Sequence, residues 1–195
     1  MKYECGLGVD GGGGKWYGIE KAGVEMKIHT LSRCGIFAAA LAICAWISVP
    51  LGDQAISLQT FGVFLALGLL GGKQATAAVA VYLLLGAVGV PVFTGFRGGF
   101  SPLLGPTGGY LWGFLAACLL WWALEKRLPD WLKATLAMAL CYGCGTVWYY
   151  FTYASGAVWP VALACVAPYL LPDGAKITLA LLLSRRLKKL TGKNT

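Results

Sequence analysis

Charged side chains are scarce in this chain. They make up 12% of its 195 residues, whereas soluble domains average about 25%. Apolar side chains make up 58% and gather in long runs. This composition excludes an ordinary soluble domain and predicts an all-α integral membrane protein. The net charge of +8 does not indicate nucleic-acid binding, because the cations are confined to the expected loops and the tail.

The chain also lacks the residue clusters that catalysis requires. Its one histidine, His29, lies before the first apolar run, and no Ser-His-Asp or paired-carboxylate arrangement is present. Cys141 and Cys144 have CxxC spacing, but zinc would need two further ligands, so we interpret them as small residues that pack helices. Gly11–Lys15 resembles a phosphate loop only superficially, because its first glycine and its Ser/Thr are both missing. We therefore expect no enzyme activity, no metal and no cofactor.

The beginning of the chain differs from the rest. Residues 1–25 show no apolar periodicity, include four consecutive glycines and lack the apolar stretch of a secretory signal. They are predicted to be a disordered leader. Residues 26–190 are predicted to form one membrane domain, followed by a cytoplasmic tail over 191–195.

Six apolar runs approach the length of about 20 residues that a bilayer-spanning helix needs. They cover residues 32–49, 56–70, 74–90, 108–124, 132–153 and 172–187. Aromatic residues at the ends of these runs, Trp121 among them, are expected to form an interfacial belt. We expect residues 154–171 to form a shorter helix or loop near the outer interface. Pro172, followed by Asp173 and Gly174, looks like a helix start, where an acidic residue helps to cap the free amides.

The cations are distributed unevenly between the two sides that six spans would create. If the chain starts in the cytoplasm, all but two of the Lys and Arg residues after Met26 fall on the cytoplasmic side, where membrane proteins favour cations. Both termini are therefore predicted to be cytoplasmic. The exceptions, Arg97 and Lys176, fall toward the outer face together with Asp53 and Asp173.

A Gly/Pro-rich outer loop is predicted between the third and fourth spans. Val90–Tyr110 holds six glycines, three prolines and a single cation, Arg97. Glycine and proline at this density oppose a continuous helix, because each is unfavourable in a helix interior. The planar guanidinium of an arginine in such a segment suits a carboxylate. Arg97 is therefore a candidate anion receptor.

Asp173 and Lys176 are three residues apart and are expected to be neighbours on one helix face. Ionisable residues at membrane depth indicate a functional site by default, although a self-paired cap at the interface is the alternative. Together with Arg97 they predict an outward pocket for a small molecule that has one anionic end. Its other end would both donate and accept hydrogen bonds. In the first run, Ala38 and Ala42 form a small-xxx-small pair that suits close helix packing within the fold or against a partner.

Four motifs carry a resemblance to a known family. They are Leu58–Phe61, Leu69–Lys73, Tyr82–Phe93 and the Gly-Pro-Thr-Gly-Gly motif within Leu104–Leu111. The chain resembles, over residues 35–189, the BioY family of biotin-specific S components, the substrate-capture subunits of energy-coupling factor (ECF) transporters. The resemblance implies a six-helix fold that binds biotin from outside. It also implies a transmembrane coupling subunit and two cytosolic ATPases as partners, in the cytoplasmic membrane of a prokaryote.

The resemblance also implies site residues, because an Arg after the third helix and an Asp-x-x-Lys at the last helix belong to the family's biotin site. They match Arg97, Asp173 and Lys176. Asp173 would accept from the ureido N–H groups, Lys176 would donate to the ureido carbonyl, and Arg97 would hold the valerate carboxylate. Gln59 and Tyr82 are further candidate contacts, or simply join neighbouring helices. The family's first helix packs on the coupling subunit through an Ala-xxx-Ala pattern, which Ala38 and Ala42 match.

Two other functions remain open from the sequence. The first is an S component for another small vitamin, since specificity depends on the site rather than on the fold. The second is a non-transport membrane scaffold or assembly subunit, in which Arg97, Asp173 and Lys176 are internal structural pairs. The sequence also leaves open whether the protein works alone, as a homo-oligomer or only with ATPase partners.

Overall fold

The structure of the protein is a computed structural model that describes residues 14–51, 54–153 and 158–190. The chain divides into two compact units, Met1–Arg33 and Cys34–Thr195. The first unit contains the beginning of helix α1, which starts at Gly14 and therefore within the range predicted to be a disordered leader. The predicted tail lies outside the described residues. The second unit contains the core and the site described below.

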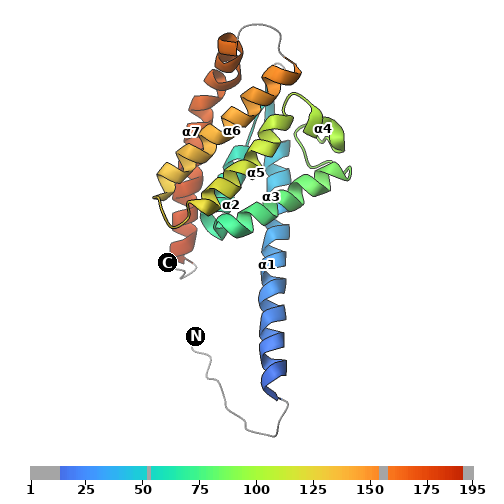
Figure 1. The fold of residues 1–195 in the computed structure, drawn as a ribbon, viewed down its shortest axis with the longest axis vertical. Helices are drawn as coiled ribbons and strands as arrows, with labels where there is room; N and C mark the ends of the chain where they lie inside the picture. Colours follow the sequence, from blue (N-terminus) through green and yellow to red (C-terminus); the bar gives the residue numbers. More distant parts are fainter. Residues whose placement is uncertain (1–13, 52–53, 154–157, 191–195) are drawn as a thin grey trace. The chain divides into compact units, whose positions relative to one another are not determined.

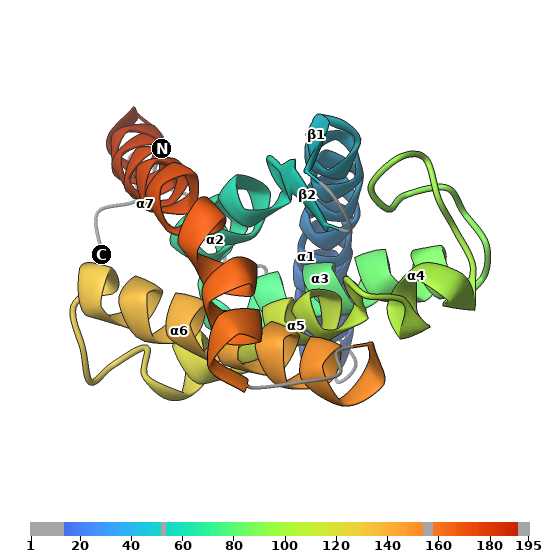
Figure 2. The same cartoon turned by 90° about the horizontal axis from the view of Figure 1, so that it is seen from above.

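Helices dominate the described part of the chain (Figure 1). In chain order the elements are α1 (Gly14–Trp46), β1 (Ser48–Leu51), β2 (Gln54–Ser57), α2 (Gln59–Leu70), α3 (Gly72–Ala87), α4 (Phe100–Leu104), α5 (Gly108–Ala123), α6 (Asp130–Thr152) and α7 (Val158–Leu190). Helix α5 packs along α6, α2 packs along α7, and α3 packs on α5 (Figures 1 and 2). The predicted third, fourth and fifth runs correspond closely to α3, α5 and α6.

A β-hairpin replaces the expected junction between the first two runs. Strands β1 and β2 pair antiparallel with Ser48 opposite Ser57 and Leu51 opposite Gln54. The first helix therefore ends at Trp46 rather than near Val49, and α2 begins only at Gln59. The predicted boundaries were wrong here because apolar content alone does not separate a short strand from a helix end.

The prediction that Pro172 begins a helix is also wrong. Helix α7 runs without interruption from Val158 to Leu190, so Pro172 and Asp173 lie in its interior. The shorter helix or loop expected before it is, from Val158 onward, part of the same helix. Packing of α7 against α2 and α6 offsets the cost of proline, which in isolation amounts to about 3 kcal/mol.

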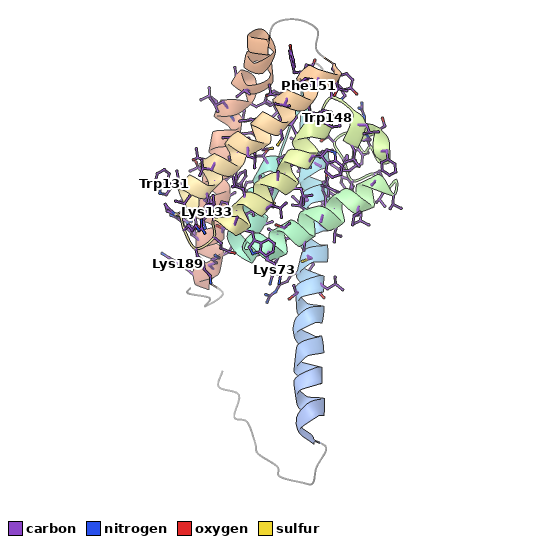
Figure 3. The ribbon with its side chains drawn as sticks, in the orientation of Figure 1. Lys73, Trp131, Lys133, Trp148, Phe151 and Lys189 are labelled. Carbon is purple, nitrogen blue, oxygen red and sulfur yellow. The ribbon has the colours of Figure 1, made fainter. Side chains whose placement is uncertain are left out.

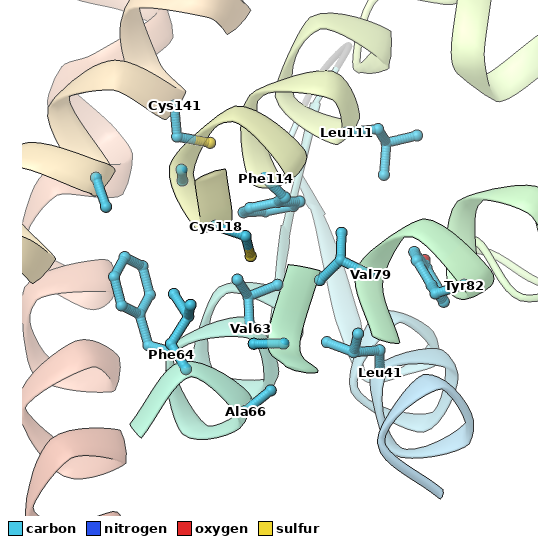
Figure 4. Packing of buried hydrophobic residues seen from close by; sticks show 14 of the residues in the cluster. Leu41, Val63, Phe64, Ala66, Val79, Tyr82, Leu111, Phe114, Cys118 and Cys141 are labelled. Atoms are coloured by element: carbon cyan, nitrogen blue, oxygen red, sulfur yellow. The ribbon is translucent and has the colours of Figure 1, made fainter. Parts of the chain in front are cut away.

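The core lies where α1, α2, α3, α5 and α6 meet. Figure 4 shows Val63 of α2, Val79 of α3 and Cys118 of α5 directed toward a common space. Phe64 packs edge-to-face on Trp121 of α5, with ring centroids 6.4 Å apart. Trp121 is 2% exposed and was wrongly expected to lie in an interfacial aromatic belt. It contributes to the core instead.

No helix within the described ranges is both long enough and apolar enough to qualify as a candidate membrane span. Large apolar side chains are nevertheless exposed on several helices, among them Ile36 of α1, Leu84 of α3, Val147 of α6 and Leu179 of α7. Figure 3 places Lys73, Lys133 and Lys189 toward one end of the helices, whereas Trp148 and Phe151 lie toward the other. The number of spans stays a prediction.

Glycines permit the closest approach between α5 and α6. A Cβ atom at Gly145 would overlap the Tyr110 ring, whereas one at Gly143 on the same helix would meet no atom within 4 Å. We expect Gly145→Ala to destabilise the protein by about 1–3 kcal/mol through overpacking. Gly143→Ala is the matched control and should be neutral or stabilising, because alanine favours helix. Thermal unfolding of both variants in detergent measures the difference, and equal melting temperatures would contradict this packing.

Candidate functional site

A cavity of about 550 Å³ lies within the second unit. Small-molecule pockets typically measure about 300–1,000 Å³, so its size suits a vitamin-sized ligand. Among the described residues, the charged side chains that line it are Arg97 and Asp173. Its other polar lining side chains are Ser48, Ser57, Gln59, Thr60, Thr94, Ser101, Thr107, Tyr110, Tyr142 and Tyr169.

Asp173 presents a buried carboxylate to this cavity. The residue is 6% exposed and both of its carboxylate oxygens accept a hydrogen bond. Tyr142 Oη of α6 donates to Oδ2 at 2.9 Å, and Lys176 Nζ donates to Oδ1 at 2.9 Å. A buried charge is costly unless it is paired and hydrogen-bonded, and these two contacts supply both conditions. The expected neighbouring pair on one helix face is therefore present.

Lys176 lies behind Asp173 and does not line the cavity. Its side chain is 14% exposed, and its Nζ also donates to the carbonyl oxygen of Ser57 at 2.9 Å. Ser57 is the last residue of β2. Lys176 therefore connects α7 to the hairpin, and an ammonium has three donors, of which two are accounted for.

Arg97 lines the same cavity as Asp173 but, unlike Asp173, it is exposed. Within the described part of the chain its guanidinium makes neither a hydrogen bond nor an ion pair. The segment between α3 and α4 positions it: Phe93 N–H donates to the Arg97 carbonyl at 3.0 Å, and the two residues form an isolated β-bridge. An unpaired guanidinium at a cavity, carried by a backbone that these contacts hold, suits an incoming carboxylate.

Close backbone contacts hold this segment. A Cβ atom at Gly98 would lie 2.5 Å from the carbonyl oxygen of Gly89, so only glycine permits that approach. Phe96 adopts a positive φ of 57°, which is uncommon outside glycine. Its ring stacks on Trp46 at a centroid distance of 4.8 Å, and Trp46 Nε1 donates to the Pro91 carbonyl at 2.9 Å. These contacts join the segment to the end of α1.

Gln59 and Tyr82 form a buried pair beside the cavity. Gln59 is 4% exposed and lines the cavity, and its Nε2 donates to Tyr82 Oη at 3.1 Å. Tyr82 does not line the cavity; its hydroxyl donates to the Val92 carbonyl at 3.1 Å. Tyr82 therefore joins α2 to the segment that carries Arg97, which is the structural alternative that the sequence left open for it.

Ala38 and Ala42 lie inside the fold. They are 2% and 5% exposed and belong to the main hydrophobic cluster. Their burial is the packing within the fold that the sequence left open as one alternative, and a coupling role for the pair stays a prediction. Gly35 and Ala39 are exposed small residues of the same helix. The small-xxx-small pair is used here for packing within the chain.

Tyr142 is the site residue that sequence reasoning missed. It lines the cavity and bonds directly to Asp173. In the sequence it lies between Cys141 and Cys144, and no local pattern marks it as a site residue. Cys141 is buried, and its Sγ donates to the Tyr110 carbonyl at 3.7 Å. Among the described residues, no three His, Cys, Asp or Glu side chains gather as metal ligands would.

The fold defines a class of protein. It matches a solved structure described as "Crystal structure at 2.1 A of the S-component for biotin from an ECF-type ABC transporter", with a TM-score of 0.76. The two chains are 28% identical, and the match covers 85% of this chain and 93% of the other. The chain is thus a predominantly helical protein of the ECF S-component type.

The chain belongs to the BioY family, whose model matches residues 20–193. It is similar to the biotin transporter BioY of Thermotoga maritima, at 40% identity over 84% of this chain and 98% of the relative. It is also similar to the probable biotin transporter BioY of Pyrococcus horikoshii, at 32% identity over 84% of this chain and 98% of the relative. The resemblance inferred from the sequence motifs is confirmed.

Ala38 is buried and the adjacent Ala39 is exposed, so large side chains at the two positions should have different effects. We expect Ala38→Trp to destabilise the protein by about 1–3 kcal/mol or more, because a large side chain overpacks the core. Ala39→Trp, on the exposed face, should leave both thermal stability and ligand binding unchanged. Unfolding and binding measurements on the two purified variants test this. A stable Ala38→Trp variant with normal binding would contradict the placement of Ala38 in the core.

Proposed function

We propose that this protein captures biotin and serves as the substrate-binding component of an ECF-type vitamin transporter. Support comes from the family, from the similarity to proteins named biotin transporters and from the chemistry of one cavity. The observation that carries the proposal is that a buried carboxylate, Asp173, and an exposed, unpaired guanidinium, Arg97, line the same cavity.

The two charged residues specify how biotin would lie. A ureido ring has two N–H donors, and the Asp173 carboxylate keeps acceptor capacity beyond its bonds to Tyr142 and Lys176. The valerate carboxylate at the other end would meet Arg97. Because Asp173 is buried and Arg97 exposed, the ring would enter first and the carboxylate would stay toward the mouth. Gln59 would contact the ligand from α2.

We further propose that the protein lies in the cytoplasmic membrane of a prokaryote with six spans and both termini cytoplasmic. Exposed apolar side chains on α1, α3, α5, α6 and α7 support contact with lipid, since soluble proteins rarely expose large apolar patches. The printed sequence contains no Walker A motif, and energy would come from a transmembrane coupling subunit and two cytosolic ATPases.

The experiment that tests the ligand is binding by the purified full-length protein. Biotin should bind saturably and displace a labelled biotin, whereas thiamine and riboflavin should not compete. Mass spectrometry of small molecules that co-purify with the protein gives an independent identification. Absence of saturable biotin binding would contradict the proposal, and binding of another vitamin would favour a different S component.

Removal of Arg97 tests how the anionic end is held. Arg97→Ala should weaken biotin binding by about 10- to 100-fold, since hydrogen bonds to charged groups contribute about 1.5–3 kcal/mol. Arg97→Lys keeps the charge but not the fork and should lose less. The methyl ester of biotin should be insensitive to both changes. Titration calorimetry measures these affinities, and tight biotin binding by Arg97→Ala would refute the role.

The thermal stability of the same variant separates transport from a structural scaffold. The Arg97 guanidinium has no partner within the described residues, so Arg97→Ala should melt at the wild-type temperature without ligand. Asp173→Asn should lower that temperature as well as biotin affinity, because it weakens a buried ion pair. If Arg97→Ala lowered stability while biotin still bound normally, a scaffold role for Arg97 would be favoured.

A further inference from the structure

Tyr142 donates a hydrogen bond to the Asp173 carboxylate and so affects which acceptor positions of that carboxylate remain for a ligand. It lies on α6, whereas Asp173 lies on α7, and the 2.9 Å bond from Tyr142 Oη to Asp173 Oδ2 crosses between the two helices. Both residues are buried, at 8% and 6% exposed, and both line the cavity. The bond therefore forms part of the cavity wall.

Two contacts fix the carboxylate plane. Lys176 holds Oδ1 from the same helix and is itself held by the Ser57 carbonyl at the end of β2. Tyr142 holds Oδ2 from α6. Without the tyrosine bond, the carboxylate would be fixed at one oxygen only and could turn about its terminal torsion, which has a broad energy profile.

The direction of the tyrosine bond has a chemical consequence. An ionised carboxylate accepts and cannot donate, and it offers about four acceptor positions on its two oxygens. The hydroxyl proton of Tyr142 is committed to Asp173, so the lone pairs of Tyr142 Oη are what remain for a ligand. This part of the cavity wall accordingly accepts hydrogen bonds and rejects ligand groups that only accept.

We propose that Tyr142 is a positioning residue that makes the Asp173 end of the cavity select ligands with paired N–H donors. Tyr142 orients the carboxylate so that two acceptor positions face the ligand in a fixed geometry. The inference rests on the proposed function, because a ureido ring carries two N–H groups of this kind. It extends that function by assigning donor selectivity to a residue of α6.

The test compares two ligands of the same shape. One is biotin; the other is its cyclic carbonate analogue, in which oxygen atoms replace the two ureido N–H groups. Tyr142→Phe should weaken biotin binding by about 10- to 100-fold, as expected for a hydrogen bond to a charged group. It should change binding of the carbonate by less than about 3-fold, because an oriented carboxylate repels ring oxygens in the first place. The affinity for biotin divided by the affinity for the carbonate should therefore fall.

Tyr153→Phe is the matched control. It also removes a hydroxyl that donates one hydrogen bond at 2.9 Å, to the Leu104 carbonyl, but Tyr153 does not line the cavity. Its affinity ratio should equal that of the wild type. A second test places 4-aminophenylalanine at position 142, which keeps the ring and an N–H donor. It should restore a ratio close to the wild-type value.

Each outcome identifies what fails. If the wild type does not bind biotin, the proposed function is wrong. If the wild type binds biotin and Tyr142→Phe weakens both ligands equally, Tyr142 acts through packing alone and the inference is overturned. An unchanged biotin affinity in Tyr142→Phe would overturn it as well. Should Tyr142→Phe not fold, a 4-aminophenylalanine variant with a ratio below about one tenth of the wild-type value would overturn the inference.

Discussion

The site depends on pairing one buried charged group, the Asp173 carboxylate, in an interior that is otherwise mostly apolar. Desolvation of an unpaired carboxylate would cost several kcal/mol, and the fold prevents this by supplying a donor to each oxygen. These donors come from α6 and α7, and the lysine in turn anchors the hairpin that precedes α2. Elements far apart in the chain are thereby joined at a single buried group. The same group provides the acceptor that a ligand would meet.

The other charged residue of the cavity follows a different physical rule. Arg97 is exposed, so its charge is solvated and does not need a protein partner. The backbone that carries Arg97 is held by a β-bridge, by a glycine-dependent backbone approach and by the stacking of Phe96 on Trp46. One residue is thus satisfied internally, and the other keeps its donors for an anion.

Sequence reasoning could predict those features that depend on short-range chemistry. The contact between Asp173 and Lys176 follows from helical spacing, and the interruption around Arg97 follows from the cost of glycine and proline in a helix. The hairpin was missed although Gly52 and Asp53 are a known two-residue hairpin signal, because its strands are short and apolar. The unbroken α7 could not be predicted, since tertiary packing, which no local pattern shows, offsets its prolines.

Long-range contacts account for the remaining differences. Tyr142 could not be identified from sequence because its relation to Asp173 exists only when α6 and α7 pack together. Similarly, the Ala38 and Ala42 pattern predicts close helix approach correctly, but the pattern alone cannot tell whether the approaching helix belongs to the same chain. In this chain both residues are in the core, so the pattern is used at least for packing within the fold.

The roles proposed for Asp173, Tyr142 and Arg97 all require one orientation of biotin in the cavity. A structure of the protein with biotin bound tests this orientation most directly. We expect the ureido ring to lie against Asp173 and Tyr142, with its N–H groups donating to the carboxylate, and the valerate carboxylate to lie on Arg97. A reversed ligand, with the carboxylate in the buried end, or biotin bound outside this cavity, would contradict this orientation and the role assigned to the two charged residues.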